Sequence, residues 1–441
     1  MNLASALRYL DQHTNLETTA GRWEHLSLDR IRRLTEAMGD PQHAYPVVHV
    51  TGTNGKGSTV RVLSALLRAS GLSVGAYTSP HLERINERLA WDGEPVDDDT
   101  LGALIGAVAD LEGVSGVRPS YFEILTAAAF RWFADVAVDV AVIEVGLLGR
   151  FDATNVADGQ VAVLTNIGAD HTDGRGAWRQ AIAEEKAGIV KAGATFMLGE
   201  VADDLRPIFD RTVSEVGAER LWVRGPEFDC DANRVAVGGR LVDLRTPESE
   251  IDQLYLPAHG AHQGDNAAIA LAAAEAFFGR PLDPEVVSEA FAGLTLPGRF
   301  EVVRHEPTVV LDCAHNVDGA AAAARTLAEE LTLSGSLILV MGLLQGRDPS
   351  AMLEAINATD AGFLVACTPA SPRAIPAAEV AAAAERMGIP AEVVPSVDDA
   401  VQRALALATP DDLVLVAGSL YVVGAARSFL TTTGDGPYWE R

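Results

Sequence analysis

The 441-residue sequence contains only three cysteines, Cys230, Cys313 and Cys367, and they lie far apart in the chain. An odd and widely spaced set argues against a disulfide framework and against a zinc cluster. We therefore expect all three cysteines to be reduced and buried. Long apolar runs are also missing. The longest, such as 337–344, have the length of a strand, well below the ~18 residues of a membrane-spanning helix.

Positive charge is scarce. The chain has 34 Lys and Arg against 61 Asp and Glu, which gives a formal net charge of −27. Nucleic acids and anionic membranes are bound by basic surfaces, so this composition argues against both kinds of partner. An anionic substrate would have to be met by a few local cations and by metal ions. The first 17 residues include Asp11 and Glu17 and lack the apolar core of a secretion signal, so we expect a cytoplasmic protein.

The composition, 48% hydrophobic and 22% charged, is that of a globular protein, and the length favours two or three domains. Strand-like and helix-like patterns alternate over residues 46–198. This alternation predicts a mostly parallel sheet wrapped on both faces, which is a doubly wound α/β fold. Residues 220–256 change to short strand patterns with turn signals and predict a small β-rich insertion.

The turn-like segment Leu296–Arg299 is the expected domain boundary. Beyond it, apolar strand patterns alternate again with Ala-rich helical patterns. This second alternation predicts a smaller, Rossmann-like α/β domain. We therefore expect an N-terminal domain over residues 1–296 and a C-terminal domain over residues 297–441.

The most informative segment is His49–Thr59, HVTGTNGKGST, in which an apolar β-rich run enters a Gly-rich turn and then a helical pattern. Such a turn points backbone N–H groups and a helix N-terminus at one spot and can cradle phosphates. Its lysine can reach the β- and γ-phosphates, and the following Ser or Thr can reach Mg²⁺. The alternative is a Gly-rich turn without a ligand. The candidate nucleotide contacts are Thr53, Asn54, Gly55, Lys56, Gly57, Ser58 and Thr59, with Ser58 also a candidate metal ligand.

Polar side chains follow other predicted strands at the same edge of the first sheet. Glu144 ends an apolar strand, and Asp170 and His171 follow the next one. Ligands of open α/β sheets bind at this edge, and carboxylate oxygens suit Mg²⁺. The alternative for Glu144 is a solvated carboxylate at a strand end, and a lone histidine is more often structural than functional.

Three further places carry candidate residues. Ser79 and His81 follow another strand end, and Asp312 and His315 follow the first parallel strand of the second domain. Two domains with polar strand ends facing each other imply a cleft that closes on substrates. Lys186 lies on a predicted helix, where a lysine is normally a surface charge.

Taken together, these motifs resemble the Mur ligase superfamily, and most closely its folylpolyglutamate synthase/dihydrofolate synthase family. The phosphate-binding loop in residues 49–59, called the P-loop below, would by itself indicate only the superfamily. The segments that carry the resemblance, in chain order, are HVTGTNGKGST (49–59), TSPHL (78–82), EVGLLGRFDATN (144–155), EKAGIVK (185–191), HQGDNA (262–267), PGRFE (297–301), DCAHN (312–316) and GSLYVVG (418–424).

The resemblance implies two Mg²⁺ sites. Ser79 and Glu144 would bind one ion, and His171 and a carbamylated Lys186 would bind the second. A carbamate explains how a lysine can serve a metal site. The implied ATP contacts are Asn266, Arg299 and Asp312. The implied catalytic residues are Lys56, Lys186 and His315, the last lying near the phosphates and the incoming amino acid.

The resemblance further implies ATP-dependent amide formation through an acyl phosphate that the amine of L-glutamate captures. The expected substrates are ATP, L-glutamate and dihydropteroate, reduced folates or both, and the expected state is a monomer. Residues 14–28 and the loop after His81 are candidate pterin contacts. Two alternatives stay open: a Mur-type ligase acting on a UDP-linked cell-wall precursor, and a nucleotide-binding protein without catalytic activity.

Overall fold

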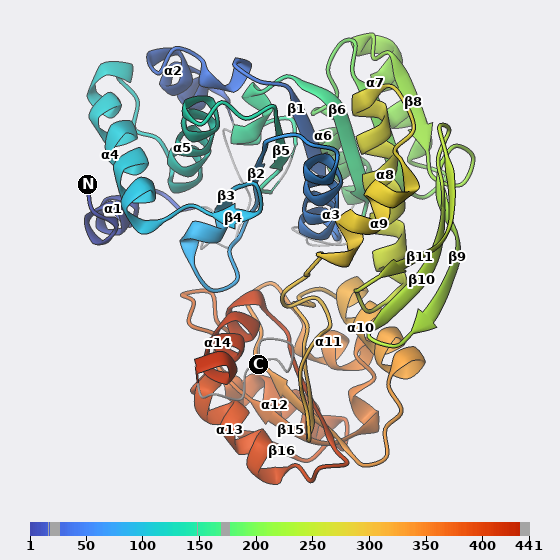
Figure 1. Cartoon of the computed structure of the whole chain (residues 1–441). Coiled ribbons are helices and arrows are strands. Elements are labelled where there is room, and N and C mark those ends of the chain that lie inside the picture. Colours follow the sequence, from blue (N-terminus) through green and yellow to red (C-terminus); the bar gives the residue numbers. More distant parts are fainter. Residues whose placement is uncertain (16, 18–26, 148, 169–176, 433–441) are drawn as a thin grey trace.

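The computed structural model describes residues 1–15, 17, 27–147, 149–168 and 177–432. An eight-stranded sheet forms the centre of the larger part of the molecule, and a six-stranded sheet forms the centre of the smaller part, which contains the C-terminus (Figure 1). The expected α/β architecture of two doubly wound units is confirmed.

The larger sheet has the strand order β4-β3-β2-β5-β1-β6-β7-β8. Its central strand β1 has the sequence VVHVT and is buried along its whole length, as expected for a parallel strand covered on both faces. Strands β2, β5, β1, β6, β7 and β8 run parallel, whereas β3 and β4 form an antiparallel edge. The strand bounds are β1 (Val47–Thr51), β2 (Val74–Tyr77), β3 (Leu89–Trp91), β4 (Glu94–Pro95), β5 (Val140–Glu144), β6 (Gly159–Asn166), β7 (Thr195–Glu200) and β8 (Arg220–Val223).

Helices cover both faces of this sheet. The core on one face packs strands against α3, α8 and α9, and the core on the other face packs them against α1, α2, α4 and α5. Helix α5 begins with a capping box in which Ser120 and Glu123 satisfy each other's backbone N–H groups. The helix bounds are α1 (Leu3–Leu10), α2 (Asp29–Ala37), α3 (Lys56–Ala69), α4 (Asp98–Ser115), α5 (Tyr121–Asp135), α6 (Trp178–Ala187), α7 (Arg206–Val216), α8 (Ala261–Phe278) and α9 (Pro284–Ala292).

The β-rich insertion is a three-stranded antiparallel sheet of β9 (Asp229–Ala236), β10 (Gly239–Arg245) and β11 (Glu250–Leu256). It begins later in the chain than expected. Strand β8, which the sequence pattern assigned to the insertion, pairs in parallel with β7 and extends the large sheet. A four-residue apolar strand has the same local pattern in either sheet, so periodicity alone cannot assign it.

The smaller part has the strand order β12-β13-β17-β14-β15-β16, in which only β12 is antiparallel to its neighbour. Strand β12 starts two residues after Arg299. The bounds of its elements are β12 (Glu301–His305), β13 (Thr308–Leu311), α10 (Val317–Glu330), β14 (Leu337–Met341), α11 (Pro349–Ala355), β15 (Ala361–Ala366), α12 (Ala377–Arg386), β16 (Ala391–Val393), α13 (Val397–Leu407), β17 (Leu413–Ala417) and α14 (Leu420–Thr432).

Two expectations from composition can be compared with the structure. The three thiols are free, and Cys313 and Cys367 are buried, but Cys230, whose Sγ lies against Gly264 of α8 near one end of the insertion sheet, is only partly buried. Among the helices of the described residues, none combines the length and the apolar character needed to cross a bilayer.

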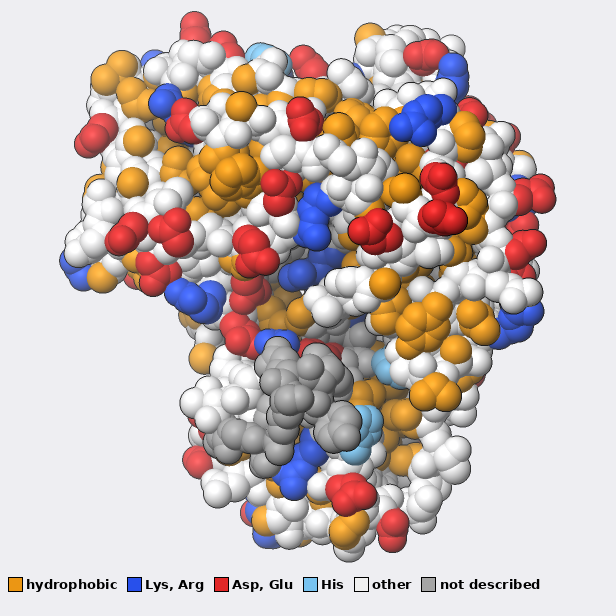
Figure 2. Space-filling model, in the orientation of Figure 1, with side chains coloured by type: hydrophobic (Ala, Val, Ile, Leu, Met, Phe, Trp, Pro, Cys, Tyr) orange, Lys and Arg blue, Asp and Glu red, His pale blue; other side chains and the backbone are white. Residues whose placement is uncertain are grey.

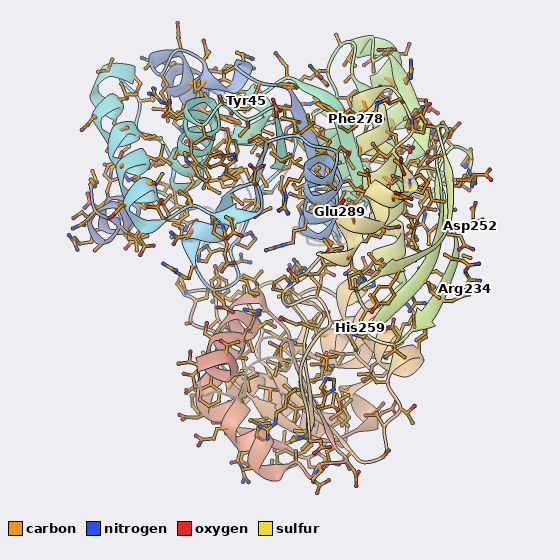
Figure 3. All side chains as sticks on the ribbon, viewed as in Figure 1. Tyr45, Arg234, Asp252, His259, Phe278 and Glu289 are labelled. Carbon is orange, nitrogen blue, oxygen red and sulfur yellow. The ribbon has the colours of Figure 1, made fainter. Side chains whose placement is uncertain are left out.

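A buried ion pair joins the insertion sheet to the smaller part. The Arg240 guanidinium on β10 contacts the Glu330 carboxylate at the end of α10, and the two side chains are 3% and 1% exposed. Nδ1 of His259 lies 2.7 Å from Oε2 of the same glutamate, and the backbone N–H of Gly260 donates to Oε1 at 2.7 Å. His259 lies at the junction of the two parts (Figure 3). Burying a carboxylate in this way requires partners on both oxygens, and Glu330 has them.

We predict that Glu330→Gln lowers the free energy of unfolding by about 3–5 kcal/mol, because it removes the only buried anion that contacts the buried Arg240 charge within the described residues. Urea unfolding followed by circular dichroism measures this change. The matched control is Glu329→Gln, since Glu329 lies 3.5 Å from Arg240 but is 48% exposed and should contribute less than about 1 kcal/mol. Equal effects of the two variants would contradict the assignment.

Candidate active site

A cleft of about 710 Å³ lies between the two parts of the molecule. The P-loop between β1 and α3 lines it on one side, and the segments after β13 and β17 line it on the other. Its lining includes seven Lys or Arg residues and six Asp or Glu residues, whereas acids outnumber bases almost twofold in the whole chain. Figure 2 shows basic side chains in the hollow of this face and acidic ones around it. The cleft is therefore suited to anions.

The P-loop adopts a backbone that glycine permits. Gly52 and Gly55 have φ angles of 148° and 81°. A Cβ at Gly52 would lie 1.8 Å from Oγ1 of Thr165, and one at Gly55 would lie 2.4 Å from Oδ1 of Asn266. Gly55 caps α3 without any side-chain hydrogen bond, so the first-turn N–H groups of that helix are available to an anion.

Two lysines contact the same carbonyl oxygen of this loop. Nζ of Lys56 donates to the oxygens of Gly52 and Thr53, both at 3.2 Å. Nζ of Lys186, a residue 6% exposed near the end of α6, donates to the oxygen of Gly52 at 2.7 Å. The structure thus brings together two residues that are 130 positions apart in the sequence.

Glu144 and Ser79 form the second corner of the site. Glu144 ends β5 and is 4% exposed, and its Oε2 accepts the backbone N–H of Ser79 at 3.2 Å. Burial raises the pKa of Glu144, while Lys56, the Ser79 N–H and Arg299 act in the opposite direction. The hydroxyl of Ser79 is buried and has no hydrogen-bond partner among the described residues.

These two residues fit a hard divalent cation. A buried carboxylate and a hydroxyl without a partner are oxygen ligands of the kind that Mg²⁺ takes together with phosphate oxygens and water. No three His, Cys, Asp or Glu side chains of the described residues are clustered so that they could hold a metal ion. A metal in this corner therefore depends on substrate or water for its remaining ligands. His171 and Asp170 lie outside the described residues.

The remaining P-loop candidates hold the loop in place. The backbone N–H of Asn54 donates to Oδ1 of Asn166 at 2.9 Å, and Oγ1 of Thr53 accepts the N–H of Gly168 at 3.0 Å. Ser58 and Thr59 are buried in the first turn of α3. Ser58 lines the cleft, whereas Thr59 does not.

The implied ATP contacts lie around the P-loop. Asn266 on α8 abuts Gly55, and its amide donates to Gln263 at 2.9 Å. A Cβ on Gly57 would have Glu144 on one side, at 3.7 Å, and Arg299 on the other, at 3.9 Å. Arg299 is therefore close to the first turn of α3.

Asp312 and His315 lie across the cleft. The Asp312 carboxylate accepts the backbone N–H groups of Phe300 and Ala314, each at 2.8 Å. Burial raises its pKa, against the effect of Arg299. The ring of His315 contacts the carbonyl of Cys313 at 3.0 Å and lines the cleft. These residues shape the loop that enters α10.

The structure shows three residues in or beside the cleft that sequence reasoning missed, of which Arg224 and Asp265 line it. Asn316 donates to Oδ1 of Asn54 at 2.9 Å and so connects the second domain directly to the P-loop. Arg224 pairs with Asp265 at 2.6 Å, and burial raises the pKa of Asp265 to about 6. Asn316 and Asp265 lie inside recognised motifs and could have been identified, whereas Arg224 has no local signal.

The fold and this cleft define a two-domain, nucleotide-using ligase of the Mur type. Residues 298–420 match the family model "Mur ligase, glutamate ligase domain". The dihydrofolate synthase/folylpolyglutamate synthase of Mycobacterium tuberculosis is 39% identical in an alignment that covers 91% of this chain and 89% of that protein. The chain belongs to the folylpolyglutamate synthase/dihydrofolate synthase family.

Solved structures agree with this membership. The M. tuberculosis folylpolyglutamate synthase complexed with ADP and AMPPCP has a TM-score of 0.89 at 37% identity, with 97% of each chain covered. A bifunctional folylpolyglutamate synthase/dihydrofolate synthase with Mn, AMPPNP and L-glutamate bound has a TM-score of 0.85 at 30% identity, with 98% of each chain covered. The superfamily and family resemblance inferred from the motifs is thus confirmed.

Behind the P-loop, a buried histidine connects β1 to the segment after β5. Nε2 of His49 lies 2.9 Å from Oγ1 of Thr154, whose hydroxyl donates to the buried Asp152 carboxylate. The histidine therefore donates from Nε2. Its Nδ1 has no partner among the described residues. Burial, helped by Lys191, lowers the pKa of His49 to about 3.

We predict that His49 makes the protein less stable in mild acid. Because its pKa is below that of an unfolded histidine, the unfolded chain takes up the proton first as the pH falls through about 6.5. The contribution is complete above that pH, and about 2 kcal/mol of it is lost between pH 7.5 and pH 5. Urea unfolding measures how much the free energy of unfolding falls between pH 7.5 and pH 5. We expect this fall to be smaller by about 2 kcal/mol in His49→Gln than in the wild-type protein. The control is His305→Gln, because His305 is exposed. The same fall in the free energy of unfolding in His49→Gln as in the wild-type protein would refute the role of His49.

Proposed function

We propose that this protein uses ATP to join L-glutamate to the carboxylate of a reduced folate, and that it also accepts dihydropteroate. The observation that carries the proposal is the arrangement around Gly52. The phosphate-binding loop with Lys56 and the Ser79–Glu144 corner face a second domain across one cleft, and Lys186 contacts the same loop at Gly52. Family membership supports the choice of substrates.

In the proposed reaction, the substrate carboxylate attacks the γ-phosphate of ATP, ADP leaves, and an acyl phosphate forms. The amine of glutamate then attacks the acyl carbon, loses a proton and displaces inorganic phosphate to give the amide. The first-turn N–H groups of α3 and Lys56 bind the polyphosphate and stabilise the charge on the transferring group. Ser79, Glu144 and Ser58 would hold Mg²⁺. A bound Mg²⁺ neutralises phosphate charge and orients the phosphate oxygens.

For Lys186 we propose carbamylation, which turns an ammonium into a carboxylate suited to a second metal ion together with His171. Its burial and its position 2.7 Å from Gly52 support this role. An unmodified lysine would place a second cation beside Lys56 and could not bind a metal. A carbamate there provides an oxygen ligand directly beside the phosphate loop.

We propose that the two domains, residues 1–296 and 297–441, provide different parts of the binding site. The first provides the P-loop and Asn266 for ATP, and the second provides Arg299, which lies beside the P-loop, together with Asp312 and His315 for the nucleotide and the incoming glutamate. Contact between the domains orients three substrates and keeps water from the acyl phosphate. The Asn54–Asn316 contact supports such cooperation.

We further propose that the protein acts as a monomer in the cytoplasm, for which its three free thiols are suited. No specific observation favours a UDP-linked precursor as the acceptor. A nucleotide-binding protein without catalysis would not need the second corner formed by Ser79 and Glu144.

The experiment that tests the function is glutamate-dependent ADP release with Mg²⁺ and ATP, with tetrahydrofolate and dihydropteroate compared as acceptors. We expect turnover with both acceptors. Turnover with only one would remove the other from the proposal. Absence of turnover with both, in a protein that still binds ATP, would contradict the folate assignment.

We predict that Lys56→Ala lowers kcat by about 10²–10³, because one preorganised cation at the transferring phosphoryl group contributes roughly 3–4 kcal/mol. Steady-state ADP release measures the change, and circular dichroism should show an intact fold. The matched control is Arg68→Ala, in the last turn of the same helix, which should keep the wild-type rate. ADP release at the wild-type rate by Lys56→Ala would exclude the role.

A further inference from the structure

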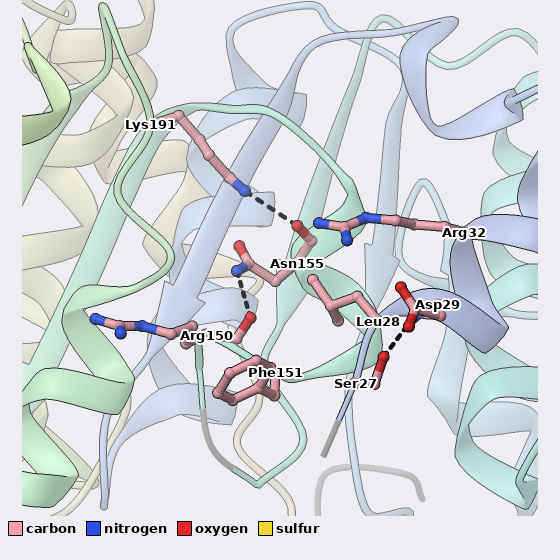
Figure 4. Close-up of a pocket in the computed structure, with 8 residues that line it drawn as sticks. All are labelled: Ser27, Leu28, Asp29, Arg32, Arg150, Phe151, Asn155 and Lys191. Carbon is pink, nitrogen blue, oxygen red and sulfur yellow. Dashed lines mark hydrogen bonds between the residues drawn. The ribbon is translucent and has the colours of Figure 1, made fainter. Parts of the chain in front are cut away.

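A second pocket lies outside the active-site cleft and shares none of its lining residues. Its volume is about 380 Å³ (Figure 4). It is formed by the start of α2, the segment after β5 and the segment after α6. The lining residues are Ser27, Leu28, Asp29, Arg32, Arg150, Phe151, Asn155 and Lys191.

The pocket is basic in an acidic protein. Three cations, Arg32, Arg150 and Lys191, line it against one carboxylate, that of Asp29, whereas the whole chain has a net charge of −27. Lys191 and Arg32 point toward each other above Asn155, and Arg150 extends to the other side (Figure 4).

The two facing cations lack a close anionic partner. Nζ of Lys191 donates to the carbonyl of Asn155 at 3.0 Å. Burial lowers the pKa of Lys191, and Arg32 adds to this effect while Asp158 opposes it. Within the described part of the chain, the Arg32 side chain has no hydrogen bond and no ion pair, and only its backbone carbonyl accepts a side-chain hydrogen bond, from the hydroxyl of Thr35 at 3.1 Å. Two like charges held together at a pocket favour an added anion.

Lysine is rare in this chain, where it supplies three of the 34 basic residues. Two of the three, Lys56 and Lys186, contact the carbonyl of Gly52 in the P-loop. The third, Lys191, lies in this pocket. Its ammonium has three donors, so it can donate to Asn155 and still present donors to a ligand.

The wall of the pocket is connected to the active site. The backbone N–H of Arg150 donates to the carbonyl of Glu185, the neighbour of Lys186, at 2.7 Å. The amide of Asn155 donates to the carbonyls of Arg150 and Gly188 at 2.9 and 3.0 Å. Oδ1 of Asn155 is buried and has no partner among the described residues. The pocket thus lies behind the segments that position Lys186.

We propose that this pocket is an anion subsite for the carboxylates of an oligo-γ-glutamyl chain, an inference that rests on the proposed function. Such a chain carries one α-carboxylate per residue, and two methylenes and an amide bond separate successive carboxylate-bearing carbons. Arg32, Lys191 and Arg150 offer cations for successive carboxylates, and the ring of Phe151, 40% exposed, offers an apolar surface for the methylenes. The same cations would also accept a free small anion such as inorganic phosphate, so the experiment separates these two sources.

The first arm measures KM for tetrahydrofolate with one and with three glutamates in Arg32→Met, Lys191→Met and the conservative Lys191→Arg. We expect the two methionine variants to raise KM for the triglutamate about fivefold, with kcat and the monoglutamate KM unchanged, and Lys191→Arg to restore most of the affinity. The matched control is Arg33→Met, on the same helix but outside the pocket. Equal KM changes for both substrates, or none, would overturn the proposal.

The second arm titrates the wild-type chain and Arg32→Met with a tri-γ-glutamate peptide and with inorganic phosphate, followed by calorimetry. Peptide binding that Arg32→Met weakens supports the subsite. Binding of phosphate alone, lost in the same variant, assigns the pocket to a free anion and overturns the role in binding the glutamyl chain. This arm needs no turnover, so failure of the proposed function appears as an inactive wild-type enzyme and not as a loss of peptide binding.

Discussion

The active site depends on the carbonyl oxygen of Gly52, which accepts hydrogen bonds from the amino groups of both Lys56 and Lys186. The two nitrogens are therefore within about 6 Å of each other. Two ammonium groups at that distance repel by about 3 kcal/mol at an effective dielectric constant of about 20. A bound polyphosphate, or conversion of Lys186 to a carbamate, would remove this repulsion. The loop without its ligands is thus prepared for negative charge.

The same loop is held from three directions, and each contact has a clear physical reason. Thr165 takes the space that a side chain at Gly52 would need, and it donates to the carbonyl of Asn54 at 2.6 Å. Asn266 takes the space beside Gly55. Asn316 reaches the loop from the second domain. Because residues from both domains fix the loop, movement of one domain against the other would shift the loop that binds the phosphates. A strongly acidic protein can therefore handle anionic substrates by gathering its few cations around one loop.

Much of this site could be predicted from the sequence, because short motifs predict the local structure of the chain. A Gly-rich turn between a strand and a helix predicts a phosphate loop, and Glu144 at the end of an apolar strand predicts a carboxylate at the same edge of the sheet. The alternation of elements likewise predicted both doubly wound units. Asp170 and His171 lie outside the described residues, so the second metal site remains a prediction.

Long-range contacts could not be predicted in this way. Strand β8 has an apolar pattern that fits the insertion as well as the large sheet. Only its pairing with β7 shows that it belongs to the large sheet. The Arg240–Glu330 pair joins residues 90 positions apart, and Arg427 reaches Glu83 across 344. Neither pair belongs to any local pattern. The meeting of Lys56 and Lys186 at Gly52 is of the same kind, because a helical lysine has no feature that shows which loop it will contact.

The measurement that tests the central claim most directly follows oxygen atoms. The folate substrate is prepared with ¹⁸O in its reacting carboxylate and turned over with ATP and L-glutamate, and the released inorganic phosphate is analysed by mass spectrometry. If the carboxylate attacks the γ-phosphate held at the Gly52 loop, one ¹⁸O atom passes to each phosphate. Phosphate without the label, formed together with the amide product, would contradict an acyl-phosphate reaction at this site.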